Sequence, residues 1–192
     1  KLSESATSTT NQFIKIDADG TVKVDGNTAT SEDALPGAQF QVRIADSGEK
    51  AQLFAGPGSK TGDDGKAYYE TKEDGSLEIT GLDADKVYYL VETKAPTGYT
   101  LNQTPIKISA IEKKDVNGKF TGYDIVMTVN EDGKEKDISN TYTFNGENKV
   151  TTLEGTLNPY GFKNSTLASL PSTGGIGTTI FTIGGCAIMI AA

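Results

Sequence analysis

The chain has 192 residues, a net charge of −8, no histidine, no tryptophan and one cysteine. So acidic a chain lacks the basic face that phosphate binding requires, which argues against a nucleic-acid partner. The absence of histidine excludes Ser-His-Asp and Cys-His nucleophile arrangements. With no histidine and one cysteine, most transition-metal sites are excluded as well. We therefore expect no metal and no cofactor, in one ordinary domain or two small ones.

The chain begins with a polar segment, residues 1–10, which is rich in serine and threonine. Such a composition is typical of a linker, here one that would follow an upstream domain. The segment has no apolar core of the kind found in signal peptides.

Short runs of β-branched, aromatic and alternating residues predict strands through the rest of the chain. These runs are residues 13–16, 40–44, 77–79, 87–91, 106–108, 123–129 and 141–144. Pairs such as Asp25-Gly26 and Asp132-Gly133 stand between the runs and are typical of tight β-turns. Residues 48–72 are polar and glycine-rich and predict a loop or short hairpin, with one helical turn as an option. With no sustained helical period and no repeat, the sequence predicts one all-β sandwich over residues 11–168.

Three stretches carry a family resemblance. Residues 88–99 (YYLVETKAPTGY) resemble the E-box YxLxETxAPxGY of CnaB-type domains, which are SpaA-like and prealbumin-like, and every fixed position of that pattern is present. Residues 35–40 resemble the LAGAxF segment of the family, and residues 14–20 resemble its first strand. The resemblance implies an Ig-like, prealbumin-like β-sandwich of the kind found in Gram-positive pilins and adhesins.

In this family a first-strand lysine, a last-strand asparagine and the E-box glutamate form an intramolecular isopeptide bond. The resemblance assigns the lysine to Lys15 and the catalytic acid to Glu92. Burial in an apolar core would favour the uncharged amine and also keep the carboxyl protonated. A protonated carboxyl can stabilise the oxyanion on the asparagine and carry a proton to the departing ammonia. The reaction turns over once, so the resemblance implies a structural protein rather than an enzyme.

The asparagine has two candidates. Asn164, in the sequence Phe162-Lys163-Asn164, fits the family pattern of a last strand just before the C-terminal signal, and we favour it. Asn140 is the alternative, and it would apply if the last strand came earlier and residues 145–169 formed a stalk. Residues 145–169 are, however, more apolar than is usual for a free linker.

The C-terminal region carries the most specific signal. Leu170, Pro171, Ser172, Thr173 and Gly174 stand directly before an uncharged apolar run, residues 175–192. The pair resembles the LPxTG cell-wall sorting signal of Gram-positive surface proteins, with its motif region at residues 169–174. The resemblance implies that a sortase cleaves after Thr173 and joins it to an amine. That amine would belong either to a peptidoglycan precursor or to a neighbouring pilin subunit.

The apolar run would make transient contact with the membrane until the sortase acts. A spanning helix needs about 20 apolar residues, and this run lacks the basic tail of the family. We interpret the run as a truncated membrane segment, and the chain as a fragment cut at both ends. The cysteine, Cys186, lies in this run, so no disulfide can stabilise the sandwich within one chain.

These features predict an exported protein at the cell surface, covalently attached to the cell wall or to a pilus. Its predicted function is a structural subunit of a sortase-assembled pilus, specifically the backbone pilin. The first alternative is the stalk of a wall-anchored adhesin whose upstream domain binds a host surface ligand. The second is a wall-anchored enzyme whose catalytic domain lies outside this sequence. No acceptor-lysine motif of the backbone pilins is visible in the chain.

Overall fold

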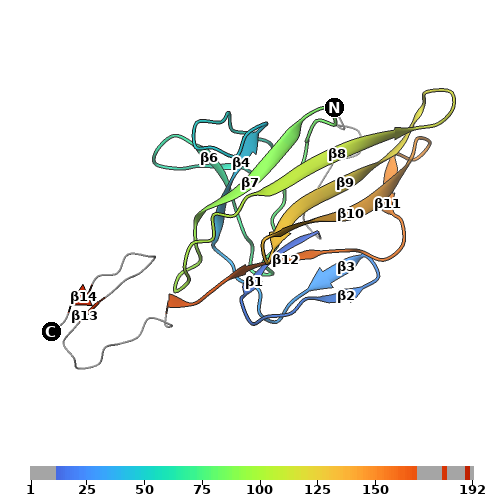
Figure 1. Ribbon diagram of the computed structural model, residues 1–192. Helices are drawn as coiled ribbons and strands as arrows, with labels where there is room; N and C mark the ends of the chain where they lie inside the picture. The colour runs from blue at the N-terminus through green and yellow to red at the C-terminus, as the bar shows by residue number, and fades with distance from the viewer. Residues whose placement is uncertain (1–11, 168–178, 181–188, 191–192) are drawn as a thin grey trace.

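The structure, a computed structural model, describes residues 12–167, 179–180 and 189–190 (Figure 1). Every named element is a strand, and the predicted all-β class is therefore confirmed. The strands are β1 (Phe13–Asp17), β2 (Lys23–Asp25), β3 (Thr28–Thr30), β4 (Gln39–Ile44), β5 (Lys60–Thr61), β6 (Ala67–Glu70), β7 (Val87–Lys94), β8 (Ile106–Lys114), β9 (Phe120–Glu131), β10 (Lys134–Asn145), β11 (Val150–Leu153), β12 (Tyr160–Asn164), β13 (Thr179–Ile180) and β14 (Met189–Ile190).

One eight-stranded sheet carries most of the fold, in the order β11-β10-β9-β8-β7-β4-β6-β5. All of its pairs are antiparallel, and Figure 1 shows the long strands β7 to β10 side by side. The strands predicted at residues 40–44, 87–91, 106–108, 123–129 and 141–144 all lie in this sheet. One face of the sheet is apolar, as alternation along a half-buried strand requires.

The turn between β9 and β10 follows directly from its sequence. Asp132 and Gly133 both have positive φ angles, 52° and 79°, as the mirror-image two-residue hairpin turns require. Glu131 and Lys134 pair directly across this turn, which fixes the register of the two longest strands.

The second layer is built on the strand pair β1–β12, which lies against the apolar face of the large sheet. The two strands run parallel, with Phe13 opposite Tyr160 at one end and Asp17 opposite Asn164 at the other. The rings of Phe13, Phe40 and Phe162 have their centroids 5.3 to 5.8 Å apart and join the two layers in one core. Segments far apart in the sequence are thus brought side by side.

One local prediction needs correction. Residues 77–79 form no strand: Leu77 and Ile79 are fully buried, and a β-bridge to Ile14 is made by the preceding Ser76. Residues 48–72 contain the predicted short hairpin, formed by β5 and β6, without the optional helical turn.

The stretch after β10 belongs to the body of the domain. β11 pairs with β10, and β12 pairs with β1. Residues 150–164 are therefore part of the sheets, which removes the reason to treat residues 145–169 as a stalk.

Beyond residue 167 little of the chain is described. β13 and β14 pair antiparallel with each other. Within the described ranges, no helix has the length and apolar character needed to span a bilayer. The predicted linker at residues 1–10, the motif region at 169–174 and most of the predicted membrane segment lie outside the described residues.

Gly122 in β9 provides a test of the sheet geometry. Its φ is +152°, and a Cβ placed there would meet the backbone oxygen of Tyr142 in β10. We expect Gly122→Ala to lower the free energy of unfolding by about 1–3 kcal/mol, because strain adds to the forced separation of two paired strands. Urea unfolding measures this change.

The matched control for that experiment is Gly146→Ala. Gly146 has no positive φ, and its nearest neighbour would be a ring atom of Phe144 at 4.0 Å. Equal losses for the two alanine variants would contradict the described pairing of β9 with β10.

Candidate functional site

Lys15 is a lysine wholly enclosed in the core. It lies in the middle of β1, and none of its surface is exposed. Its Nζ donates a hydrogen bond to the carbonyl of Phe162, at 3.0 Å, and stands 4.9 Å from the centre of the Phe162 ring. The amine therefore has one backbone acceptor in otherwise largely apolar surroundings.

The burial of Lys15 follows from the position of β1, which is covered on both faces. Four successive residues, from Phe13 to Ile16, are buried, so the strand does not alternate between core and solvent. One edge of β1 pairs with β12, and along the other edge Gly75 and Leu35 bond the backbone of Lys15 at 2.8 Å. Gly75 approaches so closely that an added Cβ would lie 2.7 Å from the Lys15 carbonyl oxygen.

Glu92 faces the same part of the core from β7. It lies opposite Phe40 in the sheet, and none of its surface is exposed. Its Oε2 accepts two hydrogen bonds of 2.8 Å, one from the side-chain amide of Asn164 and one from the backbone N–H of Asn102.

Asn164 closes the cluster from the end of β12 and is 2% exposed. Its Nδ2 donates to Glu92 Oε2 and to the carbonyl of Thr100, both at 2.8 Å. In the parallel register Lys15 lies opposite Phe162, two residues before Asn164. Because side chains alternate along a strand, Lys15 and Asn164 project from the same face of the pair.

Two oxygens in this cluster have no donor. Among the described residues, Glu92 Oε1 and Asn164 Oδ1 are the buried side-chain atoms without a hydrogen-bond partner. An unsatisfied buried acceptor costs about 1–3 kcal/mol. A proton on Glu92 Oε1 would turn that atom into a donor, and Asn164 Oδ1 is the neighbouring group that lacks one.

Burial sets the protonation of both ionisable groups. It lowers the pKa of the Lys15 amine to about 7, although the carboxylates of Glu92 and Asp17 act in the opposite direction. Burial also raises the pKa of the Glu92 carboxyl, against the hydrogen bonds from Asn102 and Asn164 and the charge of Lys15. Both shifts favour a neutral amine beside a neutral acid, the states needed for attack on a carbonyl.

Sequence reasoning missed the segment that follows the E-box. The backbone groups of Thr100 and Asn102 contact the amide of Asn164 and the carboxyl of Glu92. Tyr99, the last residue of the E-box, donates its hydroxyl to Asp17 Oδ2 at 2.8 Å. The final tyrosine of the motif could have pointed to this region, whereas contacts made through the backbone leave no signature in the sequence.

Asn140 lies in β10 and makes its hydrogen bonds elsewhere. Its Nδ2 donates to Gln12 Oε1 at 3.2 Å and to the Asn158 carbonyl at 2.7 Å, and its Oδ1 accepts from Asn158 N–H at 2.8 Å. Both polar atoms of its amide are therefore satisfied without Glu92. The five residues of the predicted sortase motif, 170–174, lie outside the described residues.

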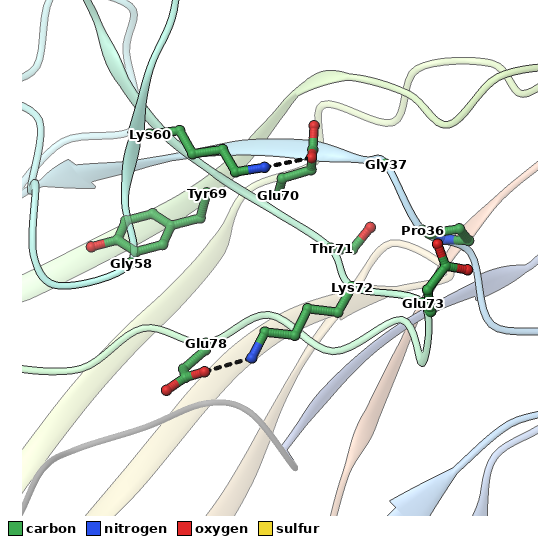
Figure 2. A pocket seen from close by; sticks show the side chains of 10 residues that line it. All are labelled: Pro36, Gly37, Gly58, Lys60, Tyr69, Glu70, Thr71, Lys72, Glu73 and Glu78. Carbon is green, nitrogen blue, oxygen red and sulfur yellow. Dashed lines mark hydrogen bonds and ion pairs between the residues drawn. The ribbon is translucent and has the colours of Figure 1, made fainter.

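A separate open cleft of about 680 Å³ lies along the edge of the large sheet that carries β5 and β6. Figure 2 shows its walls bridged by two ion pairs, Lys60 with Glu70 and Lys72 with Glu78. None of the three core residues Lys15, Glu92 and Asn164 lines it. Within the described ranges, no group of three or more His, Cys, Asp or Glu side chains is placed to hold a metal ion.

Comparison with protein families gives two matches. The SpaA family, a prealbumin-like fold domain, matches residues 12–124, and the LPXTG cell wall anchor motif matches residues 163–192. A comparison with curated proteins gives no match.

Among solved structures, the chain is similar to the pilus 2b backbone protein of group B streptococcus. The identity is 22% and the TM-score is 0.38, over 83% of this chain and 42% of that protein. The chain thus spans less than half the length of that protein.

The fold and the anchor motif together define a class of protein, the cell-wall-anchored surface proteins of prealbumin-like fold. The chain belongs to the SpaA prealbumin-like domain family, whose match covers more than half of its residues. Its LPXTG anchor motif marks it as an exported sortase substrate that is covalently attached to the cell wall.

The buried amine predicts a pH dependence in any form in which Lys15 stays unmodified. In the variant Asn164→Ala, the folded state binds fewer protons than the unfolded state between pH about 7 and 10.5, the pKa values of Lys15 in the two states. Stability should therefore rise with pH across this window, by up to about 5 kcal/mol for a shift of this size. Urea unfolding at a series of pH values measures the slope.

The control combines Asn164→Ala with Lys15→Met, which removes the titrating group and keeps an unbranched side chain. The double variant should lose the rise in stability between neutral and alkaline pH. Identical slopes for the single and double variants would show that Lys15 is not buried as a neutral amine.

Proposed function

We propose that this protein is a structural subunit of a sortase-assembled pilus, whose domain links Lys15 to Asn164 through a self-formed isopeptide bond. The observation that carries the proposal is the buried cluster of amine, carboxyl and amide, with two oxygens that a single proton would satisfy. The prealbumin-like fold and the LPXTG anchor motif support a location at the cell surface.

The reaction exchanges one amide for another. The neutral Lys15 Nζ attacks Cγ of Asn164, the Cγ–Nδ2 bond breaks, and ammonia leaves. Lys15 donates one hydrogen to the Phe162 carbonyl, so its lone pair remains free for the attack. Because folding holds the amine and the amide in place, no bimolecular encounter is needed, and this proximity accounts for a large part of the rate enhancement.

Glu92 would serve as both acid and base in this exchange. A proton on Oε1 would stabilise the developing oxyanion at Asn164 Oδ1. Oε2 already contacts the leaving nitrogen, and it can pass the proton that Lys15 loses to that nitrogen. The carboxyl ends the reaction in its starting state. The lysine and the asparagine are consumed, so the domain is its own substrate and turns over once.

The strand arrangement supports a load-bearing role. The chain enters β1 at Phe13 and leaves β12 at Asn164, and these positions lie at opposite ends of one parallel pair. Tension along the chain would therefore shear the β1–β12 pair. A covalent bond from Lys15 to Asn164 would transmit that tension and leave the rest of the fold unloaded.

Intact-mass and peptide mass spectrometry test the linkage. The parent protein should be lighter by one ammonia and should yield a branched peptide that joins the Lys15 and Asn164 fragments. Lys15→Met, Glu92→Gln and Asn164→Ala should each keep the full mass. Of the three variants, Glu92→Gln changes the shape of the side chain least, because it replaces the acid group with an amide of nearly the same volume. Its melting temperature should fall by about 10–20 °C, because the bond closes a loop of roughly 150 residues.

A branched peptide at Asn140 would replace Asn164 as the partner and overturn the proposed cluster. A parent protein of full mass would remove the linkage from the proposal altogether, whereas the cell-wall attachment would stand.

Pilus assembly has a separate test in cells. We expect the protein in its native cells to form a ladder of covalent polymers, because Thr173 would be joined to an amine on the next subunit. Thr173→Ala should abolish the ladder, and electrophoresis of wall extracts after boiling in detergent measures it. Wall-linked monomers without a ladder would instead favour the stalk of a surface adhesin.

A further inference from the structure

Residues 98–102, which we call the strap, lie along the chain that continues beyond β12. Leu167 N–H donates to the carbonyl of Gly98 at 2.9 Å, and Thr100 N–H donates to the carbonyl of Ser165 at 2.8 Å. The strap therefore joins the end of the E-box to the segment that carries Asn164.

Asn102 ends the strap and makes three hydrogen bonds in three directions. Its backbone N–H donates to Glu92 Oε2 at 2.8 Å. Its side-chain Nδ2 donates to the carbonyl of Lys163 in β12 at 3.0 Å, and its Oδ1 accepts from Thr104 N–H at 3.2 Å. The side-chain hydrogen bond to Lys163 therefore fixes the backbone N–H of Asn102 relative to β12.

This contact distinguishes the two oxygens of Glu92. Oε2 faces two donors, the N–H of Asn102 and the Nδ2 of Asn164. A proton on Oε2 would meet these donors and would break one of the hydrogen bonds. Oε1 faces no donor in the described structure, and Asn164 Oδ1 is in the same condition.

We propose that Asn102 is a positioning residue for the self-linking reaction, which selects the protonated oxygen of Glu92. By fastening the strap to β12, its side chain holds the backbone N–H on Oε2 and leaves Oε1 to carry the acid proton toward Asn164 Oδ1. This inference rests on the proposed isopeptide bond.

The same contact has a signature in the pH profile of the reaction. The hydrogen bond from Asn102 lowers the pKa of Glu92 against the larger effect of burial. The charged group that faces Glu92 is Lys15 from β1, and Asp17 on the same strand acts on Lys15. Loosening Asn102 should raise the pKa of Glu92 and move the limb of the rate profile that reports Glu92 to higher pH. The limb that reports Lys15 should stay in place.

The experiment follows the loss of ammonia in newly made protein. The full chain is synthesised in a short cell-free pulse and diluted into buffers from acidic to alkaline pH. Samples are quenched over time for intact-mass measurement. Asn102→Ala should link roughly 10- to 100-fold more slowly than the parent, as for other small misplacements of a reacting group, with one limb of the pH–rate profile shifted to higher pH.

Asn148→Ala is the matched control. Asn148 accepts the backbone N–H two residues later, that of Val150 at 3.2 Å, as Asn102 does with Thr104, but it lies far along the chain in the loop after β10. It should link at the parental rate with an unshifted profile.

Melting temperatures in the Glu92→Gln background, where no bond forms, separate folding from rate. If Asn102→Ala does not fold, Asn102→Ser replaces it, since serine keeps an oxygen for Thr104 N–H but is too short to reach Lys163.

The outcomes separate the two proposals. A parent chain that never loses ammonia defeats the isopeptide bond itself. A parent chain that links, with Asn102→Ala matching it in rate and profile, overturns only the role of Asn102. A slower rate with an unmoved pH–rate profile also overturns it, because a purely structural tether would act in that way.

Discussion

The exclusion of water from the Lys15 amine is the constraint on which the rest of the structure depends. Burying a charged ammonium at this position would cost free energy, because a buried charge needs a close partner of opposite charge and full hydrogen bonding. The side chain is fully buried, and the carbonyl and the aromatic ring of Phe162 in β12 lie next to this one nitrogen. The unlinked domain therefore holds an unfavourable group, and chemistry that turns the amine into an amide would remove the penalty permanently.

The sequence predicted the all-β class from short strand runs and turn pairs, whereas the family resemblance assigned Lys15 and Glu92 and favoured Asn164 over Asn140. Lys15 stands between Ile14 and Ile16, and alternation alone would place such a lysine in solvent. The E-box resemblance pointed instead to burial, and the structure shows why: β1 is an interior strand covered on both faces. Composition cannot reveal this, because whether a strand is interior depends on partners distant in the sequence.

The remaining details required the three-dimensional register. Asn140, in the middle of β10, and Asn164, at the end of β12, are both buried asparagines, and their hydrogen bonds distinguish their surroundings. Asn102 contacts Glu92 through its backbone N–H and belongs to no motif. Residues 77–79 have the apolar character of a strand, yet they lie outside the named strands, where Leu77 and Ile79 are fully buried in the core. By contrast, Asp132-Gly133 encodes its turn locally, and that prediction was confirmed.

The placement of the turns has a consequence for resistance to proteolysis. Exposed turns are where proteases cut most readily, and the hairpin tips at Asp25-Gly26, Asp64-Gly65, Asn117-Gly118 and Asp132-Gly133 all lie between Lys15 and Asn164. With those two residues joined, this whole stretch becomes a closed ring. A single cut at any of these tips would open the ring without severing the path from one terminus to the other. A nicked molecule would thus remain attached to the cell wall, and only a break outside the ring would release it.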